Sequence, residues 1–246
     1  MIQWISGKVV ENFQWSDSVF SLRVITESFD FKAGQFVRLG LNVGGEQVLR
    51  AYSVASAPGE SILDFVIARV EGGLLSPLLA ELKPGDEVNI TQPAGGFFTL
   101  DEVPDGDDLW MLSTGTGIGP FISMLRTEQP WRRFKRIVLV QGVREAQDLT
   151  YREFINECQQ RYPGQLVYQP IVSREALPEA LAGRIPDLIA SSELQEACGI
   201  NFTEHSQVML CGNPDMIQSS REQLKALGLE KNTRRKPGQV TSENYW

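Results

Sequence analysis

Two kinds of reactive side chain are scarce in this sequence. There is one histidine, His205, in a polar stretch, and there are three scattered cysteines, Cys158, Cys198 and Cys211. A lone histidine excludes hydrolysis by a histidine-based dyad or triad. Three separated cysteines are too few for a disulfide framework, a four-thiolate iron–sulfur cluster or a closed zinc site, so we predict no metal site. Any redox centre must therefore be a bound cofactor.

Long apolar runs are also missing. No stretch approaches the roughly 18 apolar residues that a membrane helix needs. Residues 1–15 alternate and carry charges where a signal peptide would be apolar. We therefore expect a cytoplasmic protein that does not bind membranes. The net charge of −8 likewise argues against nucleic acid as a partner.

The chain of 246 residues is long enough for two domains. In the first, residues 1–100, short segments of alternating polarity are separated by glycine and proline turns, which predicts an antiparallel β-barrel. Ser76 as N-cap and Pro77 in the first turn predict one short helix there. The predicted barrel strands are 18–26, 35–41, 62–70 and 86–91.

The pattern changes after residues 101–108, an acidic stretch that resembles a linker. Apolar strands then alternate with amphipathic helices, which predicts a doubly wound parallel sheet over residues 101–246. Asn213 and Pro214 open the last helix. The predicted strands are 109–113, 137–141, 166–172 and 207–211, and the predicted helices lie near 118–127, 150–162 and 214–227.

A glycine-rich segment, residues 114–120 (TGTGIGP), directly follows the first of these strands and opens a helix. Glycines let backbone N–H groups approach a diphosphate, and the helix dipole favours its charge. The spacing differs from the G-x-G-x-x-G dinucleotide fingerprint, and there is no Walker lysine. The segment is therefore either a diphosphate site or only a tight turn.

Arginine and serine side chains follow the next two strands, and ligands of open parallel sheets lie beyond such strand ends. Arginine with a serine hydroxyl suits the 2′-phosphate of NADP, whereas an acid there suits NAD. The neighbouring Glu175 leaves NAD open, and surface ion pairing is the alternative role for the arginines. The residues concerned are Val143, Arg144, Ser173, Arg174 and Arg184.

Several motifs occur together and in order along the whole chain. They are Arg50-Ala51-Tyr52-Ser53, Gly73-Leu74-Leu75-Ser76-Pro77, residues 115–120, residues 208–214 (VMLCGNP) and a terminal Tyr245-Trp246. In this combination the sequence resembles the ferredoxin–NADP reductase family, and within it the bacterial ferredoxin or flavodoxin reductases, whose chains also end in Tyr-Trp.

The resemblance implies an FAD site in the barrel. Arg50 would contact the FAD diphosphate, Tyr52 would pack on the flavin, and Ser53 would hydrogen-bond near flavin N5. Other residues would line the flavin, cradle the diphosphate or, at the C-terminus, form a stacking lid. The implied FAD residues are Arg50, Ala51, Tyr52, Ser53, Val66, Ile67, Ala68, Arg69, Leu74, Leu75, Ser76, Thr116, Tyr245 and Trp246.

The resemblance also implies an NADP site in the α/β domain. Thr116 would touch both cofactors, and Cys211 would lie near the nicotinamide C4, although a cysteine that ends a buried strand is ordinarily a small hydrophobe. Ser53, Cys211 and Trp246 are the implied catalytic residues. The implied NADP residues are Val143, Arg144, Ser173, Arg174, Arg184, Asn213, Pro214 and Asp215.

The implied activity is electron transfer between NADPH and ferredoxin or flavodoxin through FAD. A hydride passes from NADPH to flavin N5, and two electrons then leave one at a time. Such a protein is expected to work as a monomer. A reductase of free flavin and a flavin-binding sensor with a vestigial nucleotide site are the alternatives.

Two basic runs stand out against the acidic composition. Residues 132–136 (RRFKR) and 231–236 (KNTRRK) each contain four lysines or arginines. Each run is either a solvated face or part of a docking patch for an acidic carrier protein. The docking hypothesis predicts a rate of carrier reduction that depends strongly on salt.

Overall fold

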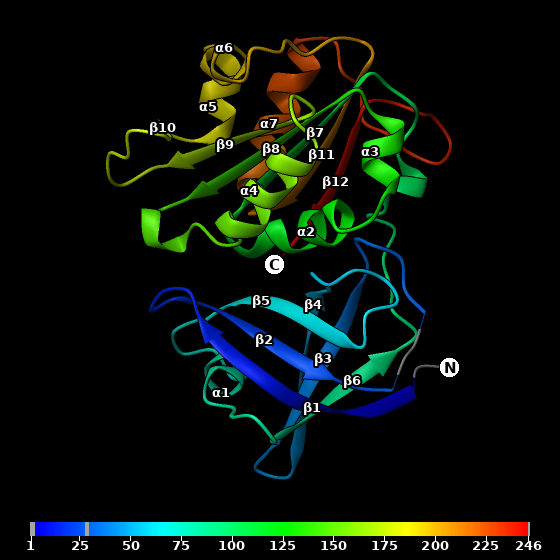
Figure 1. Cartoon of the computed structure of the whole chain (residues 1–246), viewed down its shortest axis with the longest axis vertical. Coiled ribbons are helices and arrows are strands. Elements are labelled where there is room, and N and C mark those ends of the chain that lie inside the picture. The colour runs from blue at the N-terminus through cyan, green and yellow to red at the C-terminus, as the bar shows by residue number, and fades with distance from the viewer. Residues whose placement is uncertain (1–2, 28–29, 246) are drawn as a thin grey trace. The chain divides into compact units, whose positions relative to one another are not determined.

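The computed structural model describes residues 3–27 and 30–245. The chain divides into two compact units, and Figure 1 labels the elements of each. One unit comprises Met1–Thr99 together with Gly119–Thr127, and the other comprises Leu100–Ile118 together with Glu128–Trp246. By its contacts, the segment Gly119–Thr127 belongs with the N-terminal unit.

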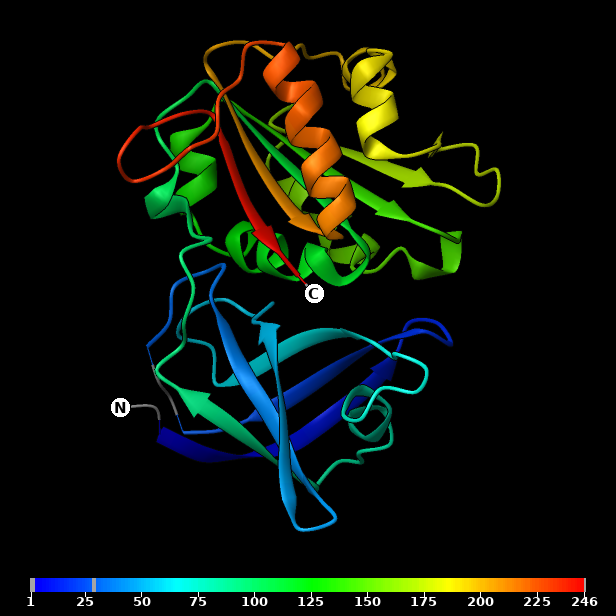
Figure 2. The same cartoon turned by 180° about the vertical axis from the view of Figure 1, so that it is seen from behind.

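The first unit is built on a six-stranded antiparallel sheet in the order β4-β3-β6-β1-β2-β5. The sheet curls, so the predicted antiparallel barrel is confirmed (Figure 2). One short helix, α1, interrupts it. The elements are β1 (Gln3–Gln14), β2 (Val19–Ile25), β3 (Phe36–Val43), β4 (Glu46–Ser53), β5 (Ile62–Ala68), α1 (Ser76–Ala80) and β6 (Glu87–Gln92).

The core of this unit follows from the two-residue period of its strands. Along β2, Phe20, Leu22 and Val24 point to one side and are buried, and they pack with Phe65 and Ile67 of the neighbouring β5. Alternation of this kind identifies a sheet with one face on the core. It explains why β2 is predictable from the sequence.

Helix α1 is fastened to the sheet by one side chain. The amide nitrogen Nδ2 of Asn12, on β1, donates hydrogen bonds to the carbonyl oxygens of Leu79, Ala80 and Leu82 at 3.0, 3.1 and 2.9 Å. These carbonyls lie at the C-terminal end of α1, where a helix leaves its acceptors unpaired. Asn12 therefore fixes the helix that follows the loop 73–75.

The second unit contains a six-stranded sheet in the order β10-β9-β8-β7-β11-β12, with every pair parallel. The strand order reverses between β7 and β11, as in a doubly wound sheet, so that prediction is also confirmed. The strands are β7 (Asp108–Thr114), β8 (Arg136–Val143), β9 (Leu166–Val172), β10 (Leu181–Ala182), β11 (Ser206–Gly212) and β12 (Val240–Asn244).

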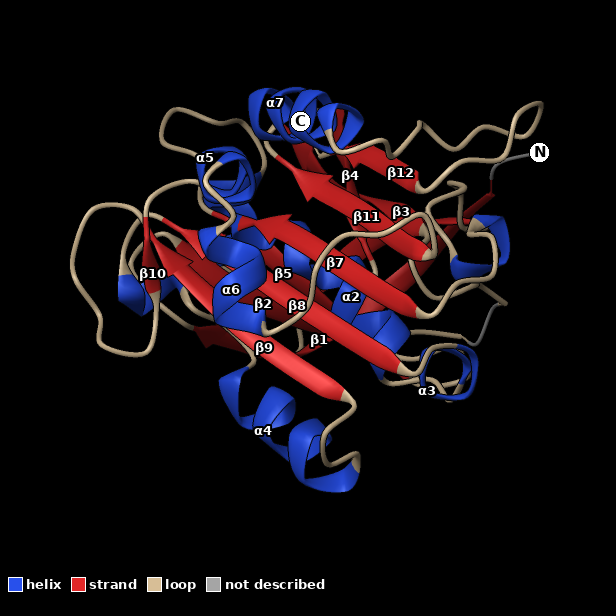
Figure 3. Ribbon diagram, turned by 90° about the horizontal axis from the view of Figure 1, so that it is seen from above, coloured by secondary structure: helices blue, strands red, loops and turns tan. Residues whose placement is uncertain are grey.

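Helices cover both faces of this sheet. α5 (Ile185–Ala190), α6 (Glu193–Cys198) and α7 (Pro214–Ala226) pack on one face, and Figures 1 and 2 show α3 (Gln129–Arg133) and α4 (Arg152–Arg161) on the other. Figure 3 shows the parallel strands along their length, with α4 on one side of the sheet and α5 and α7 on the other. No helix in the described ranges is long and apolar enough to cross a membrane.

Two sequence predictions, the helix 118–127 and the linker 101–108, need correction. The predicted helix 118–127 begins as a 3-10 turn, η2 (Gly115–Ile118), and continues as α2 (Gly119–Leu125). The predicted linker 101–108 contains the 3-10 turn η1 (Leu100–Glu102), and Arg133 donates to the carbonyl oxygens of Leu100 and Val103 at 2.6 and 2.7 Å. The linker is thus held in place by hydrogen bonds.

Candidate functional site

Two glycine-containing loops meet where the strand order of the parallel sheet reverses. A Cβ on Gly117 would lie 2.7 Å from the carbonyl oxygen of Cys211, and a Cβ on Gly212 would lie 2.2 Å from Thr114 Oγ1. The backbone N–H of Asn213 donates to the same Thr114 Oγ1 at 2.9 Å. The loops after β7 and β11 therefore pack backbone against backbone, which only glycine permits.

The loop after β11 leads directly into α7. The side chain of Asn213 accepts hydrogen bonds from the backbone N–H groups of Asp215 and Met216 at 2.8 and 3.2 Å, and Pro214 occupies the first turn. This is the N-cap arrangement that the sequence predicts. Asn213, Pro214 and Asp215 consequently lie at the switch point of the sheet, where doubly wound proteins bind dinucleotides.

Cys211 lies fully buried at the end of β11. In the β11–β12 register it faces Glu243, a residue that the sequence analysis missed. Burial raises the pKa of the Cys211 thiol well above its usual value, and the nearby Glu243 carboxylate raises it further. The thiol is therefore neutral at pH 7 and is not a nucleophilic thiolate.

Glu243 itself titrates near neutrality. Burial raises the pKa of its carboxyl from 4.5 to about 7. The polar strand around it, β12 (VTSEN), has no apolar pattern and gave no signal of a half-buried acid. Directly after β12, the chain stays attached to the sheet, because the backbone N–H of Tyr245 donates to the carbonyl of Gly212 at 3.1 Å. Trp246 lies outside the described residues.

The predicted arginines gather at the same edge of the sheet. The backbone N–H of Arg174 donates to the carbonyl of Arg144 at 3.0 Å, so the loops after β8 and β9 run side by side. Arg184 follows β10, the next strand in the sheet, as the N-cap of α5. All three arginines are exposed, and none forms an ion pair with another described residue.

Ser173 and Val143 belong to the same pair of loops. The Ser173 backbone N–H and Oγ both reach the carbonyl oxygen of Val143, at 3.1 and 3.3 Å. The neighbouring Glu175 carboxylate accepts a hydrogen bond from the backbone N–H of Ala146, which opens the 3-10 turn η3 (Ala146–Asp148). Glu175 is thus engaged in bracing the loop after β8, which favours arginine recognition of a phosphate over acid recognition of a ribose.

Four predicted FAD residues lie on β4. Arg50 is exposed and donates from Nη1 to its neighbour's carbonyl, Leu49 O, at 2.7 Å. Tyr52 packs against the barrel core, and burial raises the pKa of its phenol to about 12 in spite of the opposing effect of Arg50. Ser53 is buried at the end of the strand. Ala51, between Arg50 and Tyr52, is exposed.

The other predicted FAD residues of this unit lie along β5 and before α1. Val66 and Ile67 are buried and Ala68 is half-buried, whereas Arg69 pairs with Glu81 at 2.8 Å. Leu74 is exposed and Leu75 buried. Thr116 lies in the other unit, buried within η2.

The prediction that Ser76 is the N-cap of α1 is wrong. Leu75 holds the N-cap position of α1, and Ser76 is its first helical residue. The Ser76 Oγ instead accepts a hydrogen bond from the backbone N–H of Val70 at 3.0 Å. The serine thus closes the loop 70–76 back on the end of β5 and fixes its shape.

The two basic runs differ in how far they are neutralised. In 132–136 every cation has an acidic partner: Arg132 with Glu128, Arg133 with Asp105, Lys135 with Asp107 and Arg136 with Asp108. In 231–236 only Arg234 forms an ion pair with a described residue, Glu102, at 2.8 Å. The solvated-face interpretation therefore describes the first run, and the second retains uncompensated charge.

Comparison with known proteins identifies both units. Residues 7–98 match the oxidoreductase FAD-binding domain and residues 111–222 the oxidoreductase NAD-binding domain. The flavodoxin/ferredoxin–NADP reductases of Shigella flexneri and Escherichia coli (strain K12) are 48% and 47% identical over 248 residues, covering 100% of each chain. A crystal structure of a ferredoxin NADP+ reductase from Neisseria gonorrhoeae with bound FAD and NADP superposes with a TM-score of 0.93 at 30% identity, covering 99% of both chains.

An antiparallel barrel followed by a parallel sheet with glycine loops at its switch point defines an oxidoreductase of the flavin and pyridine-nucleotide class. The chain belongs to the flavodoxin/ferredoxin–NADP reductase family. Its cofactors are FAD and NADP(H). The residues present fit them, since the backbone approach at Gly117 and Gly212 and the exposed arginines suit a phosphorylated dinucleotide.

Proposed function

We propose that this protein transfers electrons between NADPH and a ferredoxin or flavodoxin through FAD. The observation that carries the proposal is the arrangement at one edge of the parallel sheet, where glycine-dependent loop packing adjoins three exposed arginines. Bound FAD supplies the conversion between two-electron hydride transfer and single-electron transfer. The proposal is supported by the 48% and 47% sequence identity, over the full length, to proteins named flavodoxin/ferredoxin–NADP reductase.

On this proposal residues 1–100 hold FAD. Arg50 binds the diphosphate, Tyr52 packs on the flavin, and Ser53 hydrogen-bonds near flavin N5. The loop closed by Ser76 completes the diphosphate cradle with backbone donors. The remaining proposed contacts are Ala51, Val66, Ile67, Ala68, Arg69, Leu74, Leu75, Thr116 and Tyr245, and the proposed lid residue Trp246 lies outside the described chain.

Residues 101–246 hold NADP. Arg174 and Arg184, with the Ser173 hydroxyl, bind the 2′-phosphate, because charge-assisted bonds from guanidinium to phosphate are strong and oriented. Val143 and Arg144 face the adenosine half of the nucleotide, and Asn213, Pro214 and Asp215 face its ribose and diphosphate. The preference for NADPH over NADH follows from this set.

Cys211 and Glu243 serve the nicotinamide end. The neutral Cys211 thiol sets the packing surface against which the ring is placed. Glu243, with a pKa of about 7, holds its proton at a carboxyl oxygen below neutral pH and releases it above. Ser53, Cys211 and Trp246 remain the proposed catalytic residues, and no general base on a histidine is needed.

The carrier protein docks on the basic residues of the segment 231–236. Lys231, Arg235 and Lys236 have no ion-pair partner among the described residues, so their positive field extends into solvent. An acidic one-electron carrier fits that field. The expected cytoplasmic location and monomeric state stay predictions.

The experiment that tests the proposal is NADPH-driven reduction of purified flavodoxin and ferredoxin by the FAD-loaded protein, at ionic strengths from about 20 to 500 mM. Carrier reduction should be fast at low salt and fall steeply as salt rises. Charge reversal of Arg235 and Lys236 together should remove most of the salt dependence. Turnover of added free flavin without reduction of either carrier would contradict the proposal.

A further inference from the structure

Helix α2 (Gly119–Leu125) belongs structurally to the barrel unit, although the chain enters it directly from the glycine loop of the parallel sheet. All its residues are buried. Phe121 packs its ring against Phe98, with centroids 5.6 Å apart. In the chain, the loop that carries Thr116 leads directly into α2.

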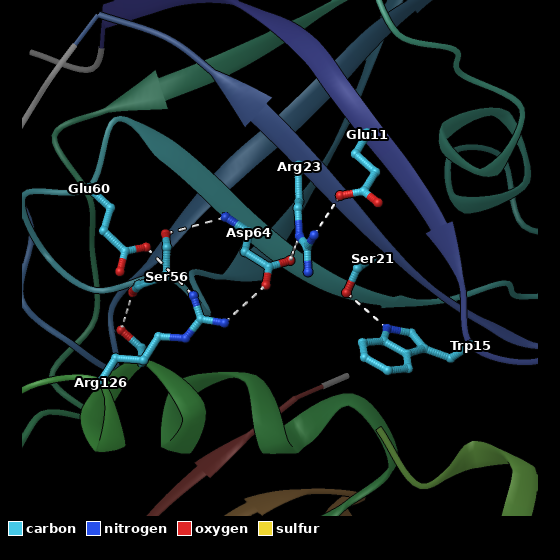
Figure 4. A network of polar contacts seen from close by, with 9 residues as sticks. Glu11, Trp15, Ser21, Arg23, Ser56, Glu60, Asp64 and Arg126 are labelled. Atoms are coloured by element: carbon cyan, nitrogen blue, oxygen red, sulfur yellow. Dashed lines mark hydrogen bonds and ion pairs between the residues drawn. The ribbon is translucent and has the colours of Figure 1, made fainter. Parts of the chain in front are cut away.

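Two polar side chains on α2 and just after it reach specific barrel atoms. Ser123 Oγ donates to the carbonyl oxygen of Ser56 at 2.7 Å, and both residues are fully buried. The Arg126 guanidinium lies 3.7 Å from the carboxylate of Asp64 and 3.6 Å from that of Glu60. Figure 4 shows Arg126 pointing from the helix toward Asp64 on β5.

These contacts act on one short segment, residues 53–56, all of which are buried. The backbone N–H of Ala55 donates to the carbonyl of Asp64 at 2.7 Å, and Asp64 N–H donates back to Ser56 Oγ at 3.3 Å. The segment is thus held by β5 on one side and by Ser123 on the other. Ser53, its first residue, ends β4.

Asp64 makes the arrangement sensitive to Arg126. Its side chain is buried, and its second cationic neighbour, Arg23, is 3.9 Å away and is itself paired with Glu11. Removing one partner of a buried charge is far more disruptive than removing an exposed pair. Loss of Arg126 is therefore expected to move β5 and the segment 53–56 that β5 holds.

We infer that Ser123 and Arg126 are positioning residues for the flavin site: through Ser56 and Asp64 they set the place of Ser53. The inference rests on the proposed function, in which Ser53 contacts the flavin. Helix α2, which directly follows the glycine loop in the chain, thus holds residues 53–56 in place. Small misplacements matter here, because a shift of about 1 Å in a reacting pair can cost ~100-fold in rate.

The test compares Ser123→Ala and Arg126→Met with Arg136→Met, all as FAD-loaded proteins. Arg136 is the matched control, because its guanidinium also lies 3.7 Å from a buried aspartate, Asp108, but in the other unit. The readouts are flavin reduction in a single turnover at saturating NADPH, the NADP+ dissociation constant and the visible circular dichroism of bound FAD. Unfolding curves establish that each variant is folded at the assay temperature.

Both α2 variants should slow flavin reduction by roughly 10-fold or more and change the flavin dichroism, with NADP+ affinity altered less than twofold. The control should leave rate and dichroism within twofold of wild type. Wild-type rates in Ser123→Ala, or an equal slowing in Arg136→Met, would overturn the inference while the proposed function stands. A wild-type protein that NADPH does not reduce would overturn the proposed function and this inference with it.

Discussion

Replacing Glu243 by glutamine isolates the effect of one half-buried carboxyl. Glu243 faces Cys211 across the β11–β12 pair, and burial raises its pKa from 4.5 to about 7. Glutamine has nearly the same shape as the protonated acid but cannot ionise. The substitution therefore removes a titration and leaves the packing in place.

The raised pKa fixes both the sign and the size of the effect. A folded-state pKa above the unfolded value means that folding favours the protonated acid, so the contribution to stability is complete below pH 4.5 and is lost as pH rises through 7. At about 1.4 kcal/mol per pKa unit the loss amounts to about 3 kcal/mol. Glu243→Gln should therefore match wild type near pH 4.5 and exceed its free energy of unfolding by up to about 3 kcal/mol at pH 8.

Urea unfolding of the FAD-loaded protein at several pH values between 4.5 and 8 measures this difference. Glu196→Gln, an exposed glutamate on α6, is the control and should follow wild type throughout. If Glu243→Gln were no more stable than wild type at pH 8, or if the Glu243 carboxyl titrated below pH 5 by NMR, the reasoning from burial would be wrong.

Three further substitutions test the cofactor sites. Gly212→Ala, at φ +134° and with its new Cβ 2.2 Å from Thr114 Oγ1, should lower the free energy of unfolding by at least about 2 kcal/mol and weaken NADP+ binding in calorimetry; wild-type values for both would contradict the loop packing. Asn12→Ala should cost about 1–3 kcal/mol and speed FAD release on dilution, since α1 loses its anchor, and unchanged FAD retention would count against this. Arg174→Ala should raise the KM for NADPH by roughly 10- to 100-fold with the KM for NADH unchanged; an equal rise for both nucleotides would refute the 2′-phosphate role.

The sequence predicts the interior of the parallel sheet well. The strand Leu166–Val172 has the predicted bounds, and the strands on either side of the switch point differ from prediction by one residue at each end. Strands buried on both faces consist of almost continuous apolar residues, which makes them easy to recognise. The capping of α7 by Asn213 was equally predictable, because the side chain and the following proline act locally.

Elements at the edges were missed. β12 reads Val-Thr-Ser-Glu-Asn and β10 has two residues, so neither presents an apolar pattern. The partner of Cys211 could not be predicted either, because the pairing with Glu243 depends on the register of two strands far apart in sequence. The ion pairs that neutralise residues 132–136 are also partly long-range, since Asp105 and Asp107 precede the run by a whole helix and strand.

The central claim is that NADPH, held by its 2′-phosphate, reduces FAD bound in the barrel. The most direct test is anaerobic stopped-flow mixing of the FAD-loaded protein with NADPH and, separately, with NADH, followed through the visible flavin absorbance. The account predicts rapid bleaching by NADPH and far slower bleaching by NADH. Equal bleaching by both nucleotides would contradict the arginine site, and a yellow protein that neither nucleotide bleaches would contradict the proposed function.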